Sequence, residues 1–433
     1  MRKRKEIFQE FVYYVFDSLI IPLIRSNFHV TESNVHQNRL LYFRHDIWRS
    51  LTEPAITTLK TSMFEEIETL KARKMLDARP LGFSQIRLLP KVNGVRPITN
   101  LRRRVTKLQN GKVTLGRSIN SIMAPVYNIF DYERRKRPAL IGSALFSMGD
   151  MYPRLKSYLQ MLQQTKATGT PFYFAKADAK SCFDTIPQNQ VVRLMKKIAA
   201  EDEYRIGRHA EIRSSERRSY RRFSHAKPAR KFVSAARAGT EFPSFDELVS
   251  TDFAKTKKDT VFIDSVVQTA HRKGTMLDLL EDHVERNVVT IGKKFFRQKT
   301  GIPQGSVLSS LLCNYFYAEL ERECLGFLKK HESILLRLID DFLLITTNKD
   351  HARQFLQIMH DGVERYGVEV NSAKSLANFK TVINGQVISQ AVDPTAFPYC
   401  GNMIDTRTLE ITKDRERRKD TGELWAYNDG KLS

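Results

Sequence analysis

The most constraining feature of this sequence is a pair of adjacent aspartates inside a long apolar run. Asp340 and Asp341 lie in the middle of residues 335–346, LLRLIDDFLLIT. Moving a carboxylate out of water costs several kcal/mol, so acids rarely stand in such a run without a partner. The run predicts two β-strands joined at the aspartates, where a divalent cation that also holds substrate phosphates would offset this cost. An exposed hairpin with an ordinary Asp-Asp turn is the competing interpretation.

A third acid ends another predicted strand. Asp178 closes residues 173–178, YFAKAD, and shares one face of that strand with Phe174 and Lys176, because side chains alternate along a strand. Three carboxylates at one point meet the requirement of two-metal nucleotidyl transfer, in which ions about 3.5–4 Å apart clamp the attacking and leaving oxygens. The sequence therefore predicts two Mg²⁺ ions held by these aspartates.

Two cations flank a predicted hairpin turn. Asn93-Gly94, within residues 84–100, is a strong turn signal because both residues tolerate a positive φ. Lys91 and Arg96 stand on either side and could grip a triphosphate, with bidentate contacts from the arginine. A surface hairpin with ordinary charges is the simpler interpretation of this motif alone.

A glycine-containing loop precedes a predicted apolar helix. Residues 301–306, GIPQGS, stand before the helix expected from Val307 to Leu320. Glycines at such a place let the backbone approach a ligand closely, and Gln304 could hydrogen-bond a template base or sugar. The loop is not a P-loop, because no Gly-Lys-Ser/Thr ends it.

Charge and composition limit the class of protein. The chain has 433 residues, with 71 Lys and Arg against 48 Asp and Glu, so its formal net charge is +23. At 41% hydrophobic residues it can bury a large core, which excludes global disorder. The charge indicates a polyanionic partner, with nucleic acid as the first candidate and a basic but otherwise ordinary enzyme as the alternative. The four cysteines have no C-x-x-C spacing, which argues against a zinc site and a disulfide framework.

Periodicity and local composition predict the remaining organisation. Residues 7–23 repeat apolar side chains at helical spacing, which predicts a soluble core helix and neither a signal peptide nor a membrane span. Between Tyr204 and Arg237 there are 11 Arg and Lys against two Glu, which indicates an insertion with a basic face or a solvated charge run. Other expected elements are helices at 115–165, 189–200 and 261–286 and a strand at 171–178.

These segments, taken together and in this order, resemble the fingers and palm of reverse transcriptases, and among them most closely the telomerase reverse transcriptase family. Residues 28–43 resemble that family's T motif, and the long gap between Asp184 and Gly301 resembles its insertion in the fingers. The resemblance covers about residues 1–411, and its stretches are 28–43, 87–100, 131–150, 173–188, 301–317, 335–346, 367–379 and 397–411.

The resemblance implies an α+β fold, a reverse-transcriptase right hand of fingers and palm. The end of a helical RNA-binding domain is expected at residues 1–75, and fingers and palm at 76–411 with an insertion at about 202–290. Residues 412–433 are expected to be a truncated or non-native tail in place of a largely missing thumb, with a read-through tail from about Gly422.

The resemblance also implies roles for single residues. Asp178, Asp340 and Asp341 correspond to the metal-binding triad and Lys374 to the general acid that protonates the leaving pyrophosphate. The nucleotide-binding residues it implies are Lys91, Arg96, Phe183, Gln304 and Gly305, with Phe183 as the gate against a ribose 2′-hydroxyl. The implied primer grip is Tyr399, Cys400 and Gly401.

The function implied is that of a telomerase catalytic subunit, active or reduced to a weakly active or inactive fragment. Its expected partners are telomerase RNA, a telomeric single-stranded DNA 3′ end, dNTPs and accessory telomerase proteins, with no membrane, at telomeres in the nucleus. A retroelement or intron-type reverse transcriptase is one alternative. A non-catalytic nucleic-acid-binding fragment is the other.

Overall fold

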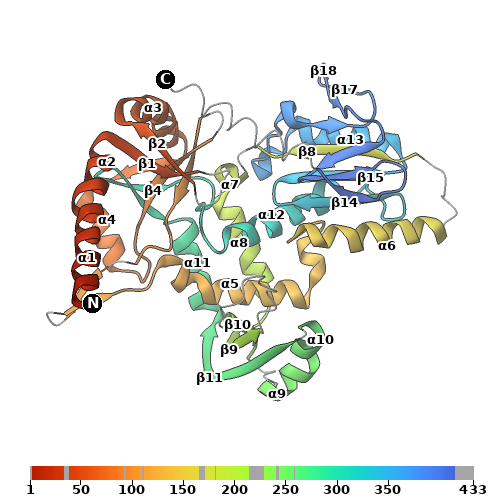
Figure 1. The fold of residues 1–433 in the computed structure, drawn as a ribbon. Coiled ribbons are helices and arrows are strands. Elements are labelled where there is room, and N and C mark those ends of the chain that lie inside the picture. The colour runs from red at the N-terminus through yellow and green to blue at the C-terminus, as the bar shows by residue number, and fades with distance from the viewer. Residues whose placement is uncertain are drawn as a thin grey trace. The chain divides into compact units, whose positions relative to one another are not determined.

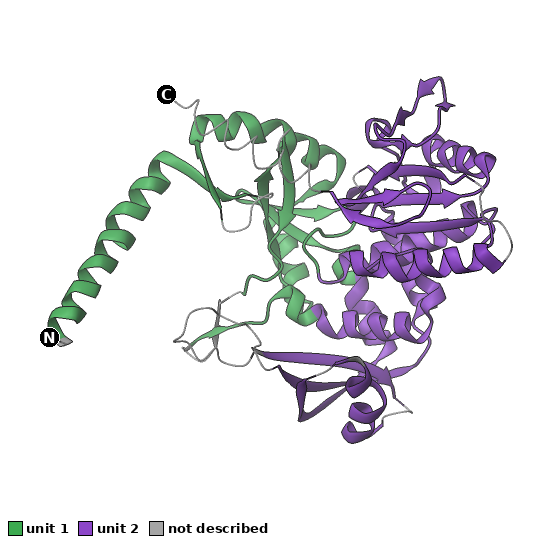
Figure 2. Ribbon diagram, turned by 45° about the vertical axis from the view of Figure 1, so that its right-hand side comes forward, with its two compact units in different colours: residues 1–122, 282–306 green, residues 123–281, 307–433 purple. Residues whose placement is uncertain are grey.

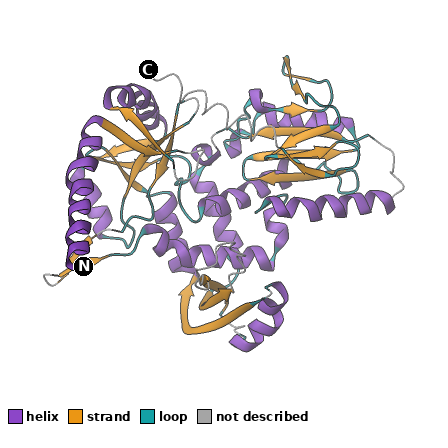
Figure 3. Cartoon of the chain, viewed as in Figure 1, coloured by secondary structure: helices purple, strands orange, loops and turns teal. Residues whose placement is uncertain are grey.

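The computed structural model describes residues 2–33, 39–91, 94–104, 106–109, 112–164, 171–180, 182–213, 229–239, 243–257 and 259–414. The chain divides into two compact units (Figure 2). Unit 1 comprises residues 1–122 and 282–306, and unit 2 comprises residues 123–281 and 307–433. Both units combine β-sheets with helices, which confirms the α+β class (Figure 3).

Unit 1 is built around a five-stranded sheet of order β3-β13-β12-β4-β5. Strands β4 and β5 form the hairpin predicted at residues 84–100, while Asn93 of its turn lies outside the described residues. Leu59 of α3 and Phe64, Val289 and Phe296 of the strands form one part of the core. The elements are α3 (His45–Ser62), β3 (Phe64–Ile67), α4 (Thr69–Asp77), β4 (Ser84–Pro90), β5 (Val95–Thr99), β6 (Thr106–Gln109), β7 (Lys112–Leu115), β12 (Val288–Ile291) and β13 (Lys294–Gln298).

The N-terminal helix of unit 1 differs from the prediction. A run of α1 (Arg2–Tyr14), η1 (Val15–Ile20) and α2 (Ile21–Asn27) leads into the β1–β2 hairpin (Phe28–Glu32 and Leu40–Arg44). The expectation of a core helix is wrong, because no side chain from Lys3 to Asn27 is buried and Phe8 and Leu23 are 65% and 66% exposed. Periodicity reports an apolar face but not whether another element covers it. Residues 3–27 are also long and apolar enough for a helix that spans a membrane, but signal sequences and the core helices of other proteins meet the same criterion of length and composition.

Unit 2 is built around a five-stranded sheet of order β14-β15-β8-β16-β19, with β15 between β14 and β8 (Figure 1). Its central strands are continuous apolar runs because both faces are covered. Leu343 and Ile345 pack with α6 and β20, whereas Phe342 contacts Tyr317 of α12 on the other face. The elements are α6 (Met151–Gln164), β8 (Tyr173–Asp178), α12 (Ser309–Cys324), β14 (Ser333–Leu338), β15 (Asp341–Thr346), α13 (Lys349–Asp361), β16 (Leu376–Ala377), β19 (Ser389–Gln390), β20 (Ala396–Tyr399), β21 (Asn402–Asp405) and β22 (Ile411–Lys413).

The segment predicted as an insertion forms a separate three-stranded sheet in unit 2. Its order is β10-β9-β11, from Ala229–Ala238, Glu203–Arg213 and Thr260–Arg272. The helix predicted at 261–286 is therefore wrong over its first half, because the β-branched residues of Thr260–Arg272 pair with β9. The helix α11 covers only Lys273–Val284, and the short helices α9 (Phe245–Leu248), η4 (Val249–Phe253) and α10 (Ala254–Thr256) precede β11.

The remaining predictions are mostly confirmed. The helix at 189–200 is α8 (Gln188–Ile198), whose Val191, Met195 and Ile198 are buried. Residues 115–165 contain α5 (Ile119–Lys136) and α6 but also two short 3₁₀ turns, η2 (Pro138–Ile141) and η3 (Met148–Asp150). Residues 415–433 and part of the basic segment lie outside the described residues. Short elements are α7 (Cys182–Thr185), η5 (Glu364–Tyr366), η6 (Ser372–Lys374), β17 (Val382–Ile383) and β18 (Gln386–Val387).

Candidate active site

Three aspartates meet at one end of the unit 2 sheet. Asp178, the last residue of β8, is directly opposite Asp341, the first residue of β15. Side chains of directly opposed residues lie on the same face of an antiparallel pair, with Cβ atoms about 4.5–5.5 Å apart. Asp340 occupies the turn between β14 and β15, and its carbonyl oxygen accepts a hydrogen bond of 3.0 Å from the Ala179 amide. The strand register thus brings together the three acids predicted from the sequence.

The cluster concentrates negative charge. Burial raises the pKa of Asp340, and the carboxylates of Asp341 and Asp178 raise that pKa further. Two lysines lie against the other two acids: the Lys374 ammonium donates to Asp178 Oδ2 at 2.8 Å, and Lys176 Nζ is 3.6 Å from Asp341 Oδ1. The hydrogen bond to Asp178 raises the pKa of Lys374, which therefore stays protonated at neutral pH.

The donor set fits a hard divalent cation. Among the residues that the structure describes, no three His, Cys, Asp or Glu side chains form a ready metal-binding group. The three acids offer oxygen donors only, which is the ligand chemistry that Mg²⁺ prefers. Burial raises the pKa of Asp340 most, and the carboxylates of Asp341 and Asp178 add to it; a dication would offset the charge of these carboxylates. Chemically, these residues are suited to hold Mg²⁺.

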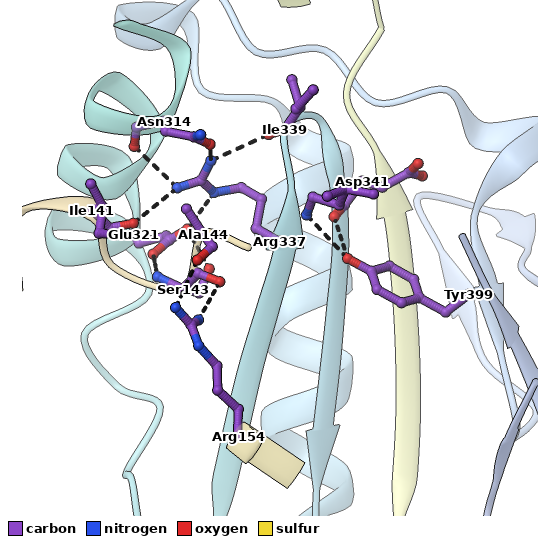
Figure 4. Close-up of polar contacts among 11 residues, drawn as sticks. Ile141, Ser143, Ala144, Arg154, Asn314, Glu321, Arg337, Ile339, Asp341 and Tyr399 are labelled. Atoms are coloured by element: carbon purple, nitrogen blue, oxygen red, sulfur yellow. Dashed lines mark hydrogen bonds and ion pairs between the residues drawn. The ribbon is translucent and has the colours of Figure 1, made fainter. Parts of the chain in front are cut away.

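A buried arginine, which sequence reasoning missed, supports the turn that carries Asp340. Arg337 is fully buried in β14, and Figure 4 shows its guanidinium among oxygens from several segments. It donates to Glu321 Oε1 at 2.6 Å and to Asn314 Oδ1 at 2.7 Å, both on α12, and to the carbonyl of Ile339 at 3.3 Å. Glu321 also accepts from the amide and hydroxyl of Ser143. The signal in the sequence was a lone arginine inside an apolar strand.

The predicted primer-grip residues lie beside the acids. They form the β20–β21 turn, where Cys400 and Gly401 have φ values of 47° and 79°. Cys400 Sγ is 3.5 Å from Asp341 Oδ2, and burial raises the pKa of this thiol to about 12. Gly401 is exposed, whereas the Tyr399 side chain is 1% exposed.

Phe183, the predicted gate, lies in the short helix α7, which begins soon after β8. Its side chain is half-buried, so part of the ring remains accessible. Its neighbour Cys182 is buried, with its sulfur 4.0 Å from that of Cys313. All four cysteines are free, as the absence of a disulfide pattern predicts.

The other predicted nucleotide-binding residues lie in unit 1. Arg96 is directly opposite Leu89 in the β4–β5 hairpin, and the Lys91 amide donates to the Gly94 carbonyl at 2.9 Å. Lys91 follows the last residue of β4, so it and Arg96 stand on either side of the hairpin turn.

The glycine-containing loop, residues 301–306, is hydrogen-bonded to the same hairpin. The carbonyl of Gln304 accepts from the amide of Thr99, the last residue of β5, at 3.1 Å and from the Thr99 hydroxyl. Gly305 has a φ of 103°, and a Cβ there would lie 2.5 Å from the Thr99 carbonyl oxygen, so only glycine fits. The loop is therefore hydrogen-bonded to the end of β5, the hairpin strand that carries Arg96.

The sequence matches two family descriptions. Residues 1–59 match "Telomerase ribonucleoprotein complex - RNA binding domain", and residues 230–398 match "Reverse transcriptase (RNA-dependent DNA polymerase)". The chain is 28% identical over 420 residues to the telomerase reverse transcriptase of Mus musculus, covering 95% of this chain and 37% of that protein. It is 29% identical over 430 residues to that of Bos taurus, covering 95% and 36%.

The fold is similar to that of solved telomerase structures. Apo telomerase from Candida Tropicalis, truncated from its C-terminal domain, matches with a TM-score of 0.64 and 21% identity over 95% of this chain and 68% of that one. Telomerase from Candida albicans in complex with the TWJ fragment of telomeric RNA matches with a TM-score of 0.66 and 20% identity over 95% and 57%. This chain spans little more than a third of the length of the mouse and bovine relatives.

Proposed function

Because the chain belongs to the telomerase reverse transcriptase family, we propose that it carries the part of a telomerase catalytic subunit that copies RNA into DNA at a primer 3′ end. The observation that carries this proposal is the meeting of Asp178, Asp340 and Asp341 where β8 and β15 adjoin. Carboxylates gathered in this way, next to lysines, suit nucleotidyl transfer.

The three aspartates would hold two Mg²⁺ ions, which lower the charge on the reacting phosphates and activate the primer hydroxyl. The Lys374 ammonium donates to Asp178 at 2.8 Å, so it lies beside the acids, where it would give a proton to the leaving pyrophosphate. The exposed part of the Phe183 ring would contact the sugar of the incoming nucleotide and exclude a 2′-hydroxyl.

The unit 1 residues would bind the nucleotide and the template. Lys91 and Arg96 flank the turn of the β4–β5 hairpin, where two cations could grip a triphosphate. Gln304 and Gly305 would contact the nucleotide and template, with Gly305 allowing close approach of the backbone. Cys400 and Gly401, next to Asp341, would contact the primer end.

The partners proposed are telomerase RNA, a telomeric DNA 3′ end, dNTPs and accessory telomerase proteins, at telomeres in the nucleus. The match of residues 1–59 to a telomerase RNA-binding domain supports the RNA partner. We propose residues 1–75 as part of that domain and 76–411 as fingers and palm, with an insertion at about 202–290.

The test is extension of a telomeric primer by the purified chain with telomerase RNA, Mg²⁺ and dNTPs. The proposal predicts a product whose sequence changes when the template bases of the RNA are changed. Extension of any RNA–DNA hybrid, with no use of telomerase RNA, would instead indicate a general reverse transcriptase. Binding without extension of either substrate would indicate a nucleic-acid-binding fragment.

A further inference from the structure

The hydroxyl of Tyr399 links the two residues that flank the turn between β14 and β15, formed by Ile339 and Asp340. It accepts a hydrogen bond from the amide of Leu338 at 3.1 Å and donates one to the carbonyl of Asp341 at 2.9 Å (Figure 4). Leu338 ends β14 and Asp341 begins β15, and the two are register partners. One side-chain oxygen thus fixes the backbone on both sides of Ile339 and Asp340.

The turn itself has a conformation that its sequence disfavours. Ile339 has a φ of 60°, in the region that favours glycine, although isoleucine is β-branched. A positive φ at the first central residue only is the pattern of a type II′ hairpin turn, where glycine normally stands. Such a backbone persists only where its surroundings over-determine it.

Two buried side chains supply these surroundings from opposite faces of the sheet. Arg337 holds the carbonyl of Ile339 from the α12 side (Figure 4). Tyr399 belongs to the hydrophobic cluster that α6 forms on the other face. Tyr399 is 1% exposed, so its hydroxyl is committed to the turn and not offered to a ligand.

We propose that Tyr399 is a positioning residue, whose hydroxyl sets the backbone geometry of the turn and thereby the directions of the Asp340 and Asp341 carboxylates. This role rests on the proposed function of those aspartates. It assigns to Tyr399 an action through the catalytic acids, which differs from the direct primer contact predicted from the sequence.

The chain offers a matched control for the loss of a buried tyrosine hydroxyl. Tyr158 belongs to the same hydrophobic cluster as Tyr399 and is 4% exposed. Its hydroxyl donates to the carbonyl of Glu332 at 2.8 Å, just before β14 begins and so at the opposite end of that strand from the turn. Tyr158→Phe therefore loses one buried hydrogen bond to the backbone while leaving the turn intact.

The experiment compares Tyr399→Phe, Tyr158→Phe and the unsubstituted chain in two measurements. The first is kcat and KM for incorporation of one complementary dNTP on an RNA–DNA hybrid. The second is the affinity of the protein for Mn²⁺, measured by electron paramagnetic resonance. Tyr399→Phe is expected to lower kcat and Mn²⁺ affinity roughly tenfold each, the scale typical when a group that orients metal ligands is removed. KM is expected to change by less than about twofold, because substrate contacts are unaltered.

Tyr158→Phe is expected to leave kcat and Mn²⁺ affinity unchanged. Equal effects of the two substitutions, or an effect of Tyr399→Phe on KM alone, would overturn the proposal. If the unsubstituted chain incorporates no nucleotide, the proposed function fails, but the Mn²⁺ measurement still decides this inference. Weaker binding by Tyr399→Phe alone would then support it, and equal binding by all three proteins would refute it.

Discussion

At the scale of single residues, charges in the unit 2 sheet are balanced to different degrees. Arg337 is fully buried, yet its guanidinium reaches the Glu321 carboxylate and several carbonyl and amide oxygens. Asp340, three residues later, has its pKa raised by burial and by two neighbouring carboxylates. The charge of Arg337 is thus neutralised within the protein. The carboxylates around Asp340 carry excess negative charge, which a bound cation would stabilise.

Replacing Arg337 with Met tests the structural part of this contrast. The substitution strands the Glu321 carboxylate in the interior, so we expect the free energy of unfolding to fall by about 3–5 kcal/mol, measured by chemical denaturation. The double variant Arg337→Met/Glu321→Leu removes both charges and is expected to recover part of that loss. If Arg337→Met were as stable as the unsubstituted chain, the buried Arg337–Glu321 pair would not have the structural role given to it here.

His283 predicts a dependence of stability on pH. It is 2% exposed beside Ser306 Oγ at 2.8 Å, and burial, aided by the Arg79 charge, lowers its pKa from 6.5 to about 4. The folded state therefore keeps His283 neutral, while the unfolded state takes up a proton below pH 6.5. This contribution to stability is complete above pH 6.5 and is lost as the pH falls toward 4, at about 1.4 kcal/mol per unit.

The check is the free energy of unfolding at pH 7 and pH 5. His283→Gln should show a smaller loss between these values than the unsubstituted chain, by about 2 kcal/mol. His331→Gln, at an imidazole that is 58% exposed, serves as the control and should keep the full loss. An unchanged pH dependence in His283→Gln would contradict the prediction.

At the scale of elements, the three acids lie at the ends of β8 and β15, two strands that the sequence predicts. The runs that end at Asp178 and surround Asp340 are predominantly apolar, which predicts buried strands, and only their register required the structure. The helix predicted over residues 261–272 is wrong because apolar residues there, such as Ile263, Val267 and Ala270, recur three to four positions apart, a helical spacing, although the segment forms a strand.

The rest of the site depends on contacts that no local pattern encodes. The Arg337 guanidinium finds its partners on α12 and at the carbonyl of Ile141, the last residue of η2, which are distant in sequence. The positive φ of Ile339 was unpredictable because isoleucine disfavours it, and the hydroxyl of Tyr399 supports it only in the folded sheet. The sequence thus predicts the chemistry-bearing acids, while the groups that orient them require the structure.

The β4–β5 hairpin gives a prediction at this scale. Arg96→Ala should raise KM for the incoming dNTP roughly tenfold, because a charge-assisted hydrogen bond to phosphate is lost. Lys294→Ala is the matched control. It removes one positive charge from the same sheet, where Lys294 Nζ pairs with Glu66 at 2.6 Å. Equal KM values for the two variants in steady-state incorporation would argue against a nucleotide-binding role for the hairpin.

At the scale of the whole molecule, the net charge of +23 predicts how nucleic acid is held. Binding that neutralises phosphates releases counterions, so the affinity for an RNA–DNA hybrid should fall linearly with salt on logarithmic axes. With six to ten phosphate contacts the loss between about 50 and 200 mM salt is roughly 10³–10⁵-fold, measurable by fluorescence anisotropy. An affinity that does not depend on salt would rule out this mode of binding.

The central claim is that the three aspartates at the end of β8 and β15 form the centre of RNA-templated nucleotidyl transfer. It is tested most directly by single-turnover incorporation of one complementary dNTP on an RNA–DNA hybrid with Mg²⁺. The unsubstituted chain is compared with Asp340→Ala and with Asp361→Ala, which removes an exposed carboxylate at the end of α13. The account predicts incorporation by the unsubstituted chain and by Asp361→Ala and none by Asp340→Ala. Incorporation by Asp340→Ala at the rate of the unsubstituted chain would contradict it.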